Sequence, residues 1–214
     1  MNFFILAIPW FLIPTTAGIF VLAGHLLGSQ GGYLFGFGFY WLFWCLLIPG
    51  VLSGKAKMTA IFRERTPLFS RSNWLAALLW IAIMLIAVMM YAGDFVRAPI
   101  ILILFAVPLA TINGFCEEIL WRGIYVKAFP NNPWLAIFYP SVGFAGWHFV
   151  PQLLYPADNS LGFVVSTFFL ALPYGYIAYR TGSAKWTALS HSLSGVLVLG
   201  GFLAPSLLEV LGIF

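Results

Sequence analysis

The sequence predicts an all-α, polytopic integral membrane protein, a helical bundle with about seven to eight transmembrane helices. Two observations carry this prediction. The 214 residues are 62% hydrophobic and only 7% charged, whereas a soluble domain has about 25% charged residues. The apolar residues also fall into runs of about 20, which is the length that crosses a bilayer. We expect one transmembrane domain over residues 1–214, in which residues 1–97 form N-terminal helices and residues 98–203 form the helices that carry a site.

Apolar runs between polar breaks predict the helices in chain order. The first lies at 3–25. No Lys or Arg precedes Lys55, so this run lacks the basic start of a cleaved signal peptide and should remain as a helix. A second helix at 33–52 and a basic loop at 53–73 follow. The remaining predicted helices are 74–93, 98–129, 133–152, 161–180 and 186–203. The apolar tail 205–214 fits either a partial eighth helix or an interfacial segment.

The basic residues predict the orientation, because cytoplasmic loops are enriched in Lys and Arg. With the N-terminus inside, nine of the ten basic residues fall on the cytoplasmic side: Lys55, Lys57, Arg63, Arg65, Arg71, Arg122, Lys127, Arg180 and Lys185. Only Arg97 faces out, near Asp94. We therefore expect a multi-pass protein of the cell membrane with a cytoplasmic N-terminus. The net charge of +4 reports this bias, so the expected partner is the lipid bilayer and no nucleic acid is expected.

The stretch GFCEEILWRG at 114–123 places three charged residues inside a predicted membrane helix. A charge near the bilayer centre costs about 2.5–3.5 kcal/mol on insertion scales, so such residues usually have a function. Glu118 and Arg122 are i,i+4 and can pair on one helix face. Glu117 is rotated by about 100° from Glu118 and shares a face with Asn113. A buried ion pair that only fixes packing would leave Glu117 unexplained.

Two of the three histidines also lie in predicted membrane helices. His148 is in GFAGWHF and His191 is in ALSHSLSG, whereas His25 lies at the outer end of the first helix. The helical rise places Glu117 about 18 Å and His148 about 21 Å from the cytoplasmic ends of their helices, but His191 only about 9 Å. These three residues can converge only if a helix tilts, starts later than expected or bends, for example near Pro140.

A carboxylate with two histidines can activate a water molecule and stabilise the oxyanion of an attacked amide. Glu117, His148 and His191 could instead bind zinc, although the helical zincin motif H-E-x-x-H is absent. The difference in depth, and the lack of a spare acid beside either histidine, favour a mechanism without a metal or other cofactor. Zinc is the alternative. A serine nucleophile is disfavoured, because Ser192 and Ser194 share a helix with His191.

These motifs resemble those of the CPBP family, the CAAX-processing and bacteriocin-processing (Abi) intramembrane proteases. The likeness spans about residues 113–195 and consists of E-E-x-x-x-R (Glu117, Glu118, Arg122), F-x-x-x-H (Phe144, His148) and a later helical histidine (His191). The resemblance implies that Glu117 is the base, His148 its partner and His191 an oxyanion donor. It also implies a membrane-associated substrate, such as a prenylated CAAX-type peptide or a leader peptide.

One position departs from the family pattern. Gly195 stands where the last motif, H-x-x-x-N, has its Asn. Either another side chain supplies the missing hydrogen-bond donor, with Ser194 and Asn113 as candidates, or the chain is an inactive relative that acts as an immunity or scaffold protein. A small proton-coupled transporter is a third, less favoured, interpretation. Transporters often repeat such sites in both halves, and here every intramembrane charge lies in the C-terminal half.

Overall fold

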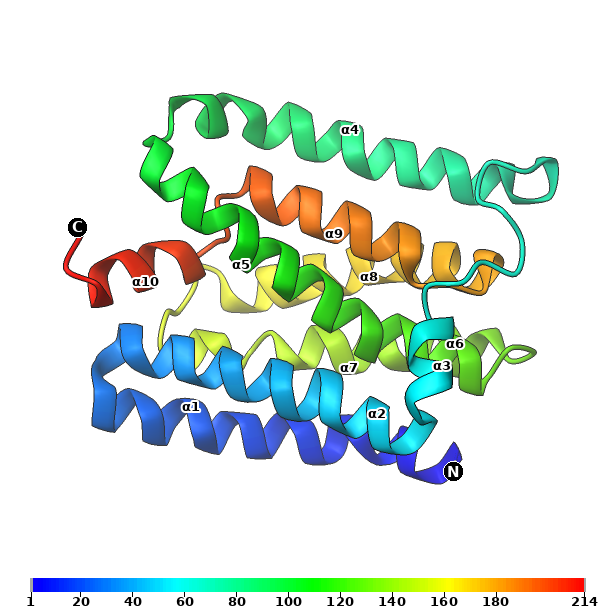
Figure 1. The fold of residues 1–214 in the computed structure, drawn as a ribbon, viewed down its shortest axis with the longest axis horizontal. Helices are drawn as coiled ribbons and strands as arrows, with labels where there is room; N and C mark the ends of the chain where they lie inside the picture. The colour runs from blue at the N-terminus through cyan, green and yellow to red at the C-terminus, as the bar shows by residue number, and fades with distance from the viewer. Residues whose placement is uncertain (1, 214) are drawn as a thin grey trace.

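The computed structural model describes residues 2–213, so Met1 and Phe214, the ends of the predicted domain, lie outside the described residues. The regular elements in that range are all helices, and it contains no strand (Figure 1). Four stretches form helices long and apolar enough to cross a membrane: Phe3–Ser53, Arg71–Arg97, Ile100–Ala128 and Ser160–Thr181. The prediction of an all-α membrane bundle is confirmed.

The first of these stretches is a hairpin. Helix α1 (Asn2–Phe39) breaks at Gly28, where φ is 76° and ψ is 170°, a conformation that glycine adopts far more readily than other residues. The chain then returns beside its first half through a π-helical segment, η1 (Tyr40–Leu47), and α2 (Ile48–Ser53) (Figure 1). A Cβ atom on Gly32 would lie 2.4 Å from the Cα of Gly24. Close approach of the two arms therefore requires glycine at this position.

The segment 53–73 is not the open loop that the sequence predicted. It contains helix α3 (Lys55–Ala60) and a 3-10 turn, η2 (Arg71–Asn73). Backbone hydrogen bonds attach it to the turn between α8 and α9: Arg65 N donates to Thr181 O (2.7 Å) and Ala184 N donates to Ile61 O (3.0 Å). These bonds pair backbone groups that a free loop would leave to solvent, and they fix the position at which α9 begins.

The remaining elements follow the predicted order with changed ends. They are α4 (Trp74–Arg97), α5 (Ile100–Glu118), the π-helical η3 (Ile119–Ile124), α6 (Tyr125–Ala128), the π-helical η4 (Trp134–Phe138), α7 (Tyr139–Trp147), the 3-10 turn η5 (Pro151–Leu153), α8 (Ser160–Thr181), α9 (Lys185–Leu197) and α10 (Leu203–Val210).

Two predicted helices, 133–152 and 186–203, are too long at their C-terminal ends. Helix α7 ends at Trp147, and α9 ends at Leu197, before three successive residues with positive φ, Leu199, Gly200 and Gly201. A right-handed helix cannot continue through such residues. The apolar tail then forms α10, the helical one of the two alternatives that the sequence allowed.

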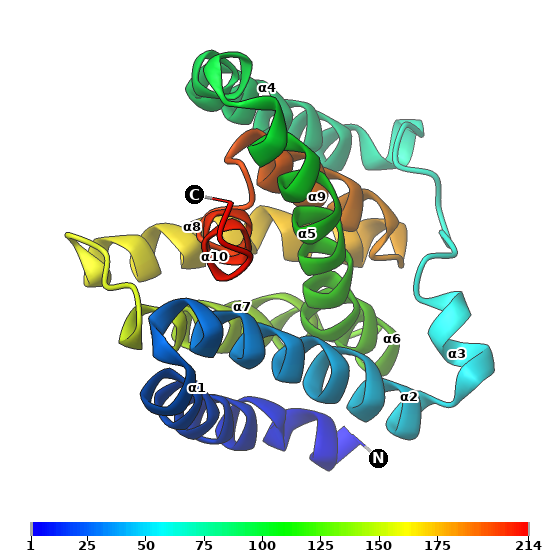
Figure 2. The same cartoon turned by 60° about the vertical axis from the view of Figure 1, so that its left-hand side comes forward.

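Helix α5 crosses the bundle between α4 and α6 (Figure 2), and its closest partner is α9. A Cβ atom on Gly114 would lie 2.5 Å from the Oγ of Ser192 and 2.7 Å from its backbone nitrogen. One turn earlier on α5, Ala110 faces Gly195, where an added Cβ would lie 3.1 Å from the Ala110 Cβ. Small residues thus let the two backbones approach each other, and this α5–α9 seam brings His191 to the acids of α5.

Candidate active site

The charged residues of α5 lie where the helix widens into the π-helical turn η3, a kind of distortion that is frequent at functional sites. Glu117, Glu118 and Arg122 are 1%, 0% and 2% exposed. Arg122 Nη1 donates to Glu118 Oε1 at 2.7 Å. The predicted pairing of Glu118 with Arg122 is therefore confirmed.

Aromatic rings enclose the guanidinium of Arg122. Its Cζ lies 4.4 Å from the centroid of the Phe144 ring and 5.4 Å from that of the Tyr174 ring. Such cation–π contacts stabilise a cation that has been removed from water. Phe144 therefore has a second task besides preceding His148, because it covers the cation that neutralises Glu118.

His148 is oriented by the end of its own helix. Its Nδ1 lies 2.8 Å from the backbone oxygen of Phe144. A carbonyl oxygen can only accept, so Nδ1 must carry a proton, and in the neutral ring the lone pair is on Nε2. His148 therefore offers an acceptor nitrogen, the form of the ring that can take a proton from water.

His191 lies between the two acids. Its Nδ1 is 3.1 Å from Glu118 Oε1, and its Nε2 is 3.4 Å from Glu117 Oε2. The estimate that placed His191 well short of Glu117 is wrong, because α5 runs obliquely through the bundle and α9 starts beneath the segment 61–66. The estimate counted residues along each helix, and it assumed that the helices are parallel and that they all begin at the same depth in the membrane. The expectation that no acid lies beside a histidine is also wrong.

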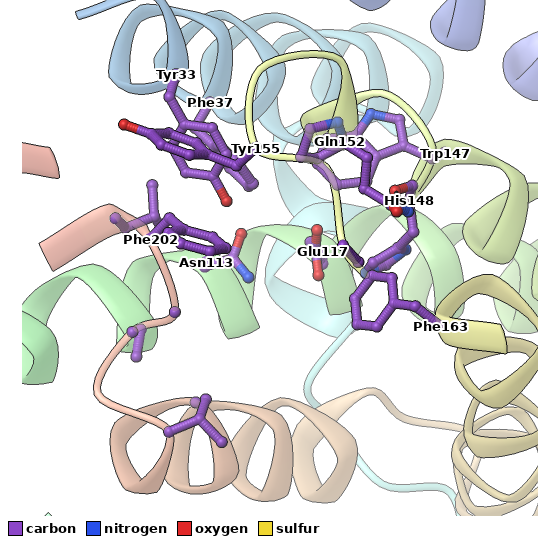
Figure 3. Close-up of a pocket in the computed structure, with 18 of the residues that line it drawn as sticks. Tyr33, Phe37, Asn113, Glu117, Trp147, His148, Gln152, Tyr155, Phe163 and Phe202 are labelled. Carbon is purple, nitrogen blue, oxygen red and sulfur yellow. Dashed lines mark hydrogen bonds between the residues drawn. The ribbon is translucent and has the colours of Figure 1, made fainter. Parts of the chain in front are cut away.

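Glu117, His148 and His191 line one cavity of about 280 Å³. Figure 3 shows Glu117 between Asn113 and His148, with aromatic side chains, among them Tyr33, Phe37 and Tyr155, at the other end of the cavity. The Oε2 atom of Glu117 accepts no hydrogen bond from any described residue. The structure thus brings together the three residues that the sequence singled out, and the Nε2 of His191, at 3.4 Å, lies near this oxygen.

Sequence analysis missed the residues that support this cavity from the N-terminal hairpin. Trp121 Nε1 donates to the hydroxyl of Tyr40 at 2.7 Å, and Trp41 Nε1 donates to Asn113 Oδ1 at 2.9 Å. The Tyr40 hydroxyl also lies within reach of Glu117. Both Tyr40 and Trp41 belong to the run FYWLFWC, which has no periodic polar residue to distinguish it from lipid-facing sequence.

The zinc alternative requires at least three protein ligands grouped around one position. No three His, Cys, Asp or Glu side chains in residues 2–213 are placed to hold one metal ion. Glu117, His148 and His191 therefore line a cavity without forming a ligand set.

Residues 98–197 match the model of a protein family described as Rce1-like, type II CAAX prenyl endopeptidase Rce1-like. The family resemblance is confirmed. The Rce1-like stretch contains Glu117, His148 and His191, and it ends where α9 ends. No curated protein and no solved structure gives a significant match to this chain. The Rce1-like match and the membrane helices support a hydrolase of the CAAX-type protease class in an integral membrane protein.

Proposed function

We propose that the protein is an intramembrane endopeptidase that cleaves a membrane-associated peptide with a water molecule activated by Glu117. The observation that carries the proposal is the difference between the two acids. Glu118 is ion-paired with Arg122, faces His191 and does not line the cavity, whereas Glu117 lines the cavity together with His148. A buried carboxylate that faces the same cavity as an acceptor imidazole can act as a general base.

In the proposed reaction Glu117 accepts a proton from water while the water oxygen bonds to the carbonyl carbon of the substrate. The acceptor nitrogen of His148 orients the same water through its second hydrogen. Breakage of the carbon–nitrogen bond then returns the proton from Glu117 to the leaving amine, so that one water molecule is consumed per peptide bond. Glu118 holds His191 in place next to Glu117, as a carboxylate holds the imidazole in other hydrolases.

A second cavity supports an apolar, membrane-associated substrate. It has a volume of about 360 Å³, lies between α4, α8 and α9, and shares His148 and His191 with the first. Its remaining lining is mostly apolar, with Ile83, Met90 and Leu170 among the contributors. A substrate that enters from the bilayer could therefore reach the two histidines without crossing water. We propose a prenylated CAAX-type peptide or a leader peptide as the substrate class.

We further propose a metal-free reaction in the cell membrane, with the N-terminus in the cytoplasm. The orientation is supported by the basic residues of 53–73, and it predicts that an Arg63→Cys variant resists impermeant thiol reagents in intact cells. The two native thiols, Cys45 and Cys116, are buried and should not react with the reagent. Ready labelling of Arg63→Cys from outside would reverse the topology.

Purified protein in liposomes, with a prenylated CAAX peptide and an unprenylated leader peptide as substrates, tests the proposal. We expect cleavage of at least one peptide by the wild type and none by Glu117→Gln. Cleavage should survive strong chelation. Activity lost with a stoichiometric metal and restored by zinc would overturn the metal-free mechanism. Cleavage of neither peptide by the wild type would favour the rival function, a non-catalytic immunity or scaffold protein, which the glycine at 195 also fits.

A further inference from the structure

Asn113 presents an oriented, unused hydrogen-bond donor to the cavity. It lies one turn before Glu117 on the same face of α5, and both residues line the same cavity (Figure 3). Its Oδ1 accepts from the indole nitrogen of Trp41 at 2.9 Å. An indole N–H can only donate, so the amide oxygen must face Trp41 and the amide nitrogen must face away from it. The side-chain orientation is therefore fixed by chemistry.

Of the other side-chain donors that line this cavity, those of His191, His148 and Gln152 are engaged, and the indole nitrogen of Trp147 is not. His191 directs both ring nitrogens at carboxylates. The Nε2 of Gln152 donates to the backbone oxygen of His148 at 2.8 Å, and the Nδ1 of His148 contacts the oxygen of Phe144. The Nδ2 of Asn113 has no such partner among residues 2–213. It is thus a donor left free one turn from the general base.

The α5–α9 seam explains why this donor comes from α5. Across the seam from α5 stands Gly195, where even a Cβ atom would lie 3.1 Å from the Cβ of Ala110. That distance is shorter than an ordinary van der Waals contact, so Ala110 would have to shift to admit any side chain at position 195. Asn113 needs no such shift, because it lies on the side of α5 that faces Trp41.

We infer that the Nδ2 of Asn113 binds the oxyanion of the reaction, and that Trp41 positions it. This inference rests on the proposed function. When the activated water bonds to the carbonyl carbon, the carbonyl π electrons move onto oxygen, and Asn113 donates a hydrogen bond to that oxygen. When the carbon–nitrogen bond breaks, the electron pair on this oxygen re-forms the carbonyl double bond. Asparagine side chains serve as oxyanion donors in other hydrolases, where loss of one costs about 10²–10³-fold in kcat.

The test measures kcat and KM of the reconstituted protein for the peptide that the wild type cleaves. We expect Asn113→Ala and Asn113→Asp each to lower kcat about 10²–10³-fold with KM little changed, because the oxyanion exists only in the transition state. Trp41→Phe frees the amide to rotate and should lower kcat by less. In the Asn113→Ala background Trp41→Phe should add nothing, since the two residues act as one unit. Thr111→Ala, whose hydroxyl bonds only the oxygen of Val107 on its own helix, is the matched control.

The outcomes separate this inference from the proposed function. If Glu117→Gln is inactive while Asn113→Ala keeps the wild-type kcat, the role of Asn113 is overturned and the proposed function stands. Additive losses in the double variant would overturn the role of Trp41 as a positioning residue. A wild type that cleaves nothing would overturn both proposals. Melting temperatures of all variants identify any loss that comes from unfolding, and Asn113→Asp keeps the shape of the side chain in case Asn113→Ala is unstable.

Discussion

The two sides of α5 at its C-terminal end differ sharply, although Glu117 and Glu118 are adjacent and equally buried. On the α9 side, Glu118 accepts from Arg122 and faces His191, and the rings of Phe144 and Tyr174 cover the cation. On the cavity side, Glu117 has no arginine partner and lines the cavity with His148. Burial alone therefore does not define the role of an acid in a membrane. Its partner and its access to the cavity do, because Arg122 neutralises Glu118, whereas Glu117 faces the cavity in which a water molecule can be activated.

The largest effect that this comparison predicts is on activity. Glu117→Gln should lower the cleavage rate by about 10²–10⁴-fold, the contribution of a general base, to a level indistinguishable from background. The fold should persist, because the free oxygen of Glu117 contributes no hydrogen bond to it. Peptide cleavage in liposomes and the melting temperature in detergent measure the two quantities on the same preparation.

The second prediction concerns stability. Glu118→Gln leaves Arg122 buried without its ion-pair partner, and breaking one partner of a buried pair costs about 3–5 kcal/mol. Thermal or denaturant unfolding in detergent should detect this loss. The double variant Glu118→Gln with Arg122→Met is the matched control, and it should recover part of the stability because no charge is left stranded. A stable but inactive Glu118→Gln beside an active Glu117→Gln would show that the two roles are reversed.

The same contrast shows what the sequence could predict. Helix periodicity was sufficient to pair Glu118 with Arg122, because both residues belong to one helix and the i,i+4 rule is local. The position of His191 was mispredicted because it depends on the tilt of α5 and on a backbone bond between Ala184 and Ile61 that joins distant segments. Trp41 could not be assigned, because its single polar atom has meaning only after the hairpin is packed against α5.

A third prediction tests the α5–α9 seam, which holds His191 against Glu118. Gly114→Ala puts a Cβ atom 2.5 Å from the Oγ of Ser192 and 2.7 Å from the backbone nitrogen of Ser192. The backbone of α9 cannot move away without a cost in free energy. We expect a loss of about 1–3 kcal/mol in the free energy of unfolding, the usual cost of overpacking. Separation of α9 from α5 should also weaken the contacts of His191. Gly38→Ala is the control, since nothing lies within 4 Å of a Cβ at that position. If both variants unfold alike, the seam is not tight.

The smallest effect is expected at an ion pair outside the membrane, which extends the comparison from buried to solvated acids. Glu64 accepts from Lys185 Nζ at 3.2 Å, from Trp186 Nε1 at 2.5 Å and from the backbone nitrogen of Leu68 at 3.1 Å. Burial alone would raise the pKa of Glu64, but the hydrogen bonds from Trp186, Lys185 and Leu68 outweigh it and leave the pKa below its usual value. Because this pKa is lower in the folded state than in the unfolded chain, the pair stabilises the fold above the unfolded pKa. The contribution is lost as the pH falls through the folded value.

Glu64→Gln should therefore cost only about 0–1 kcal/mol at neutral pH, since the pair is partly solvated, with the Lys185 side chain 49% and the Glu64 side chain 19% exposed. The difference from wild type should shrink as the pH is lowered below the ordinary range of a glutamate, because the wild-type carboxyl then also loses its charge. Unfolding in detergent at neutral and at acidic pH measures both values, with Glu118→Gln in parallel. A loss at Glu64 as large as that at Glu118 would mean that solvent exposure does not set the strength of these ion pairs. The contrast between the buried and the partly solvated acid would then fail.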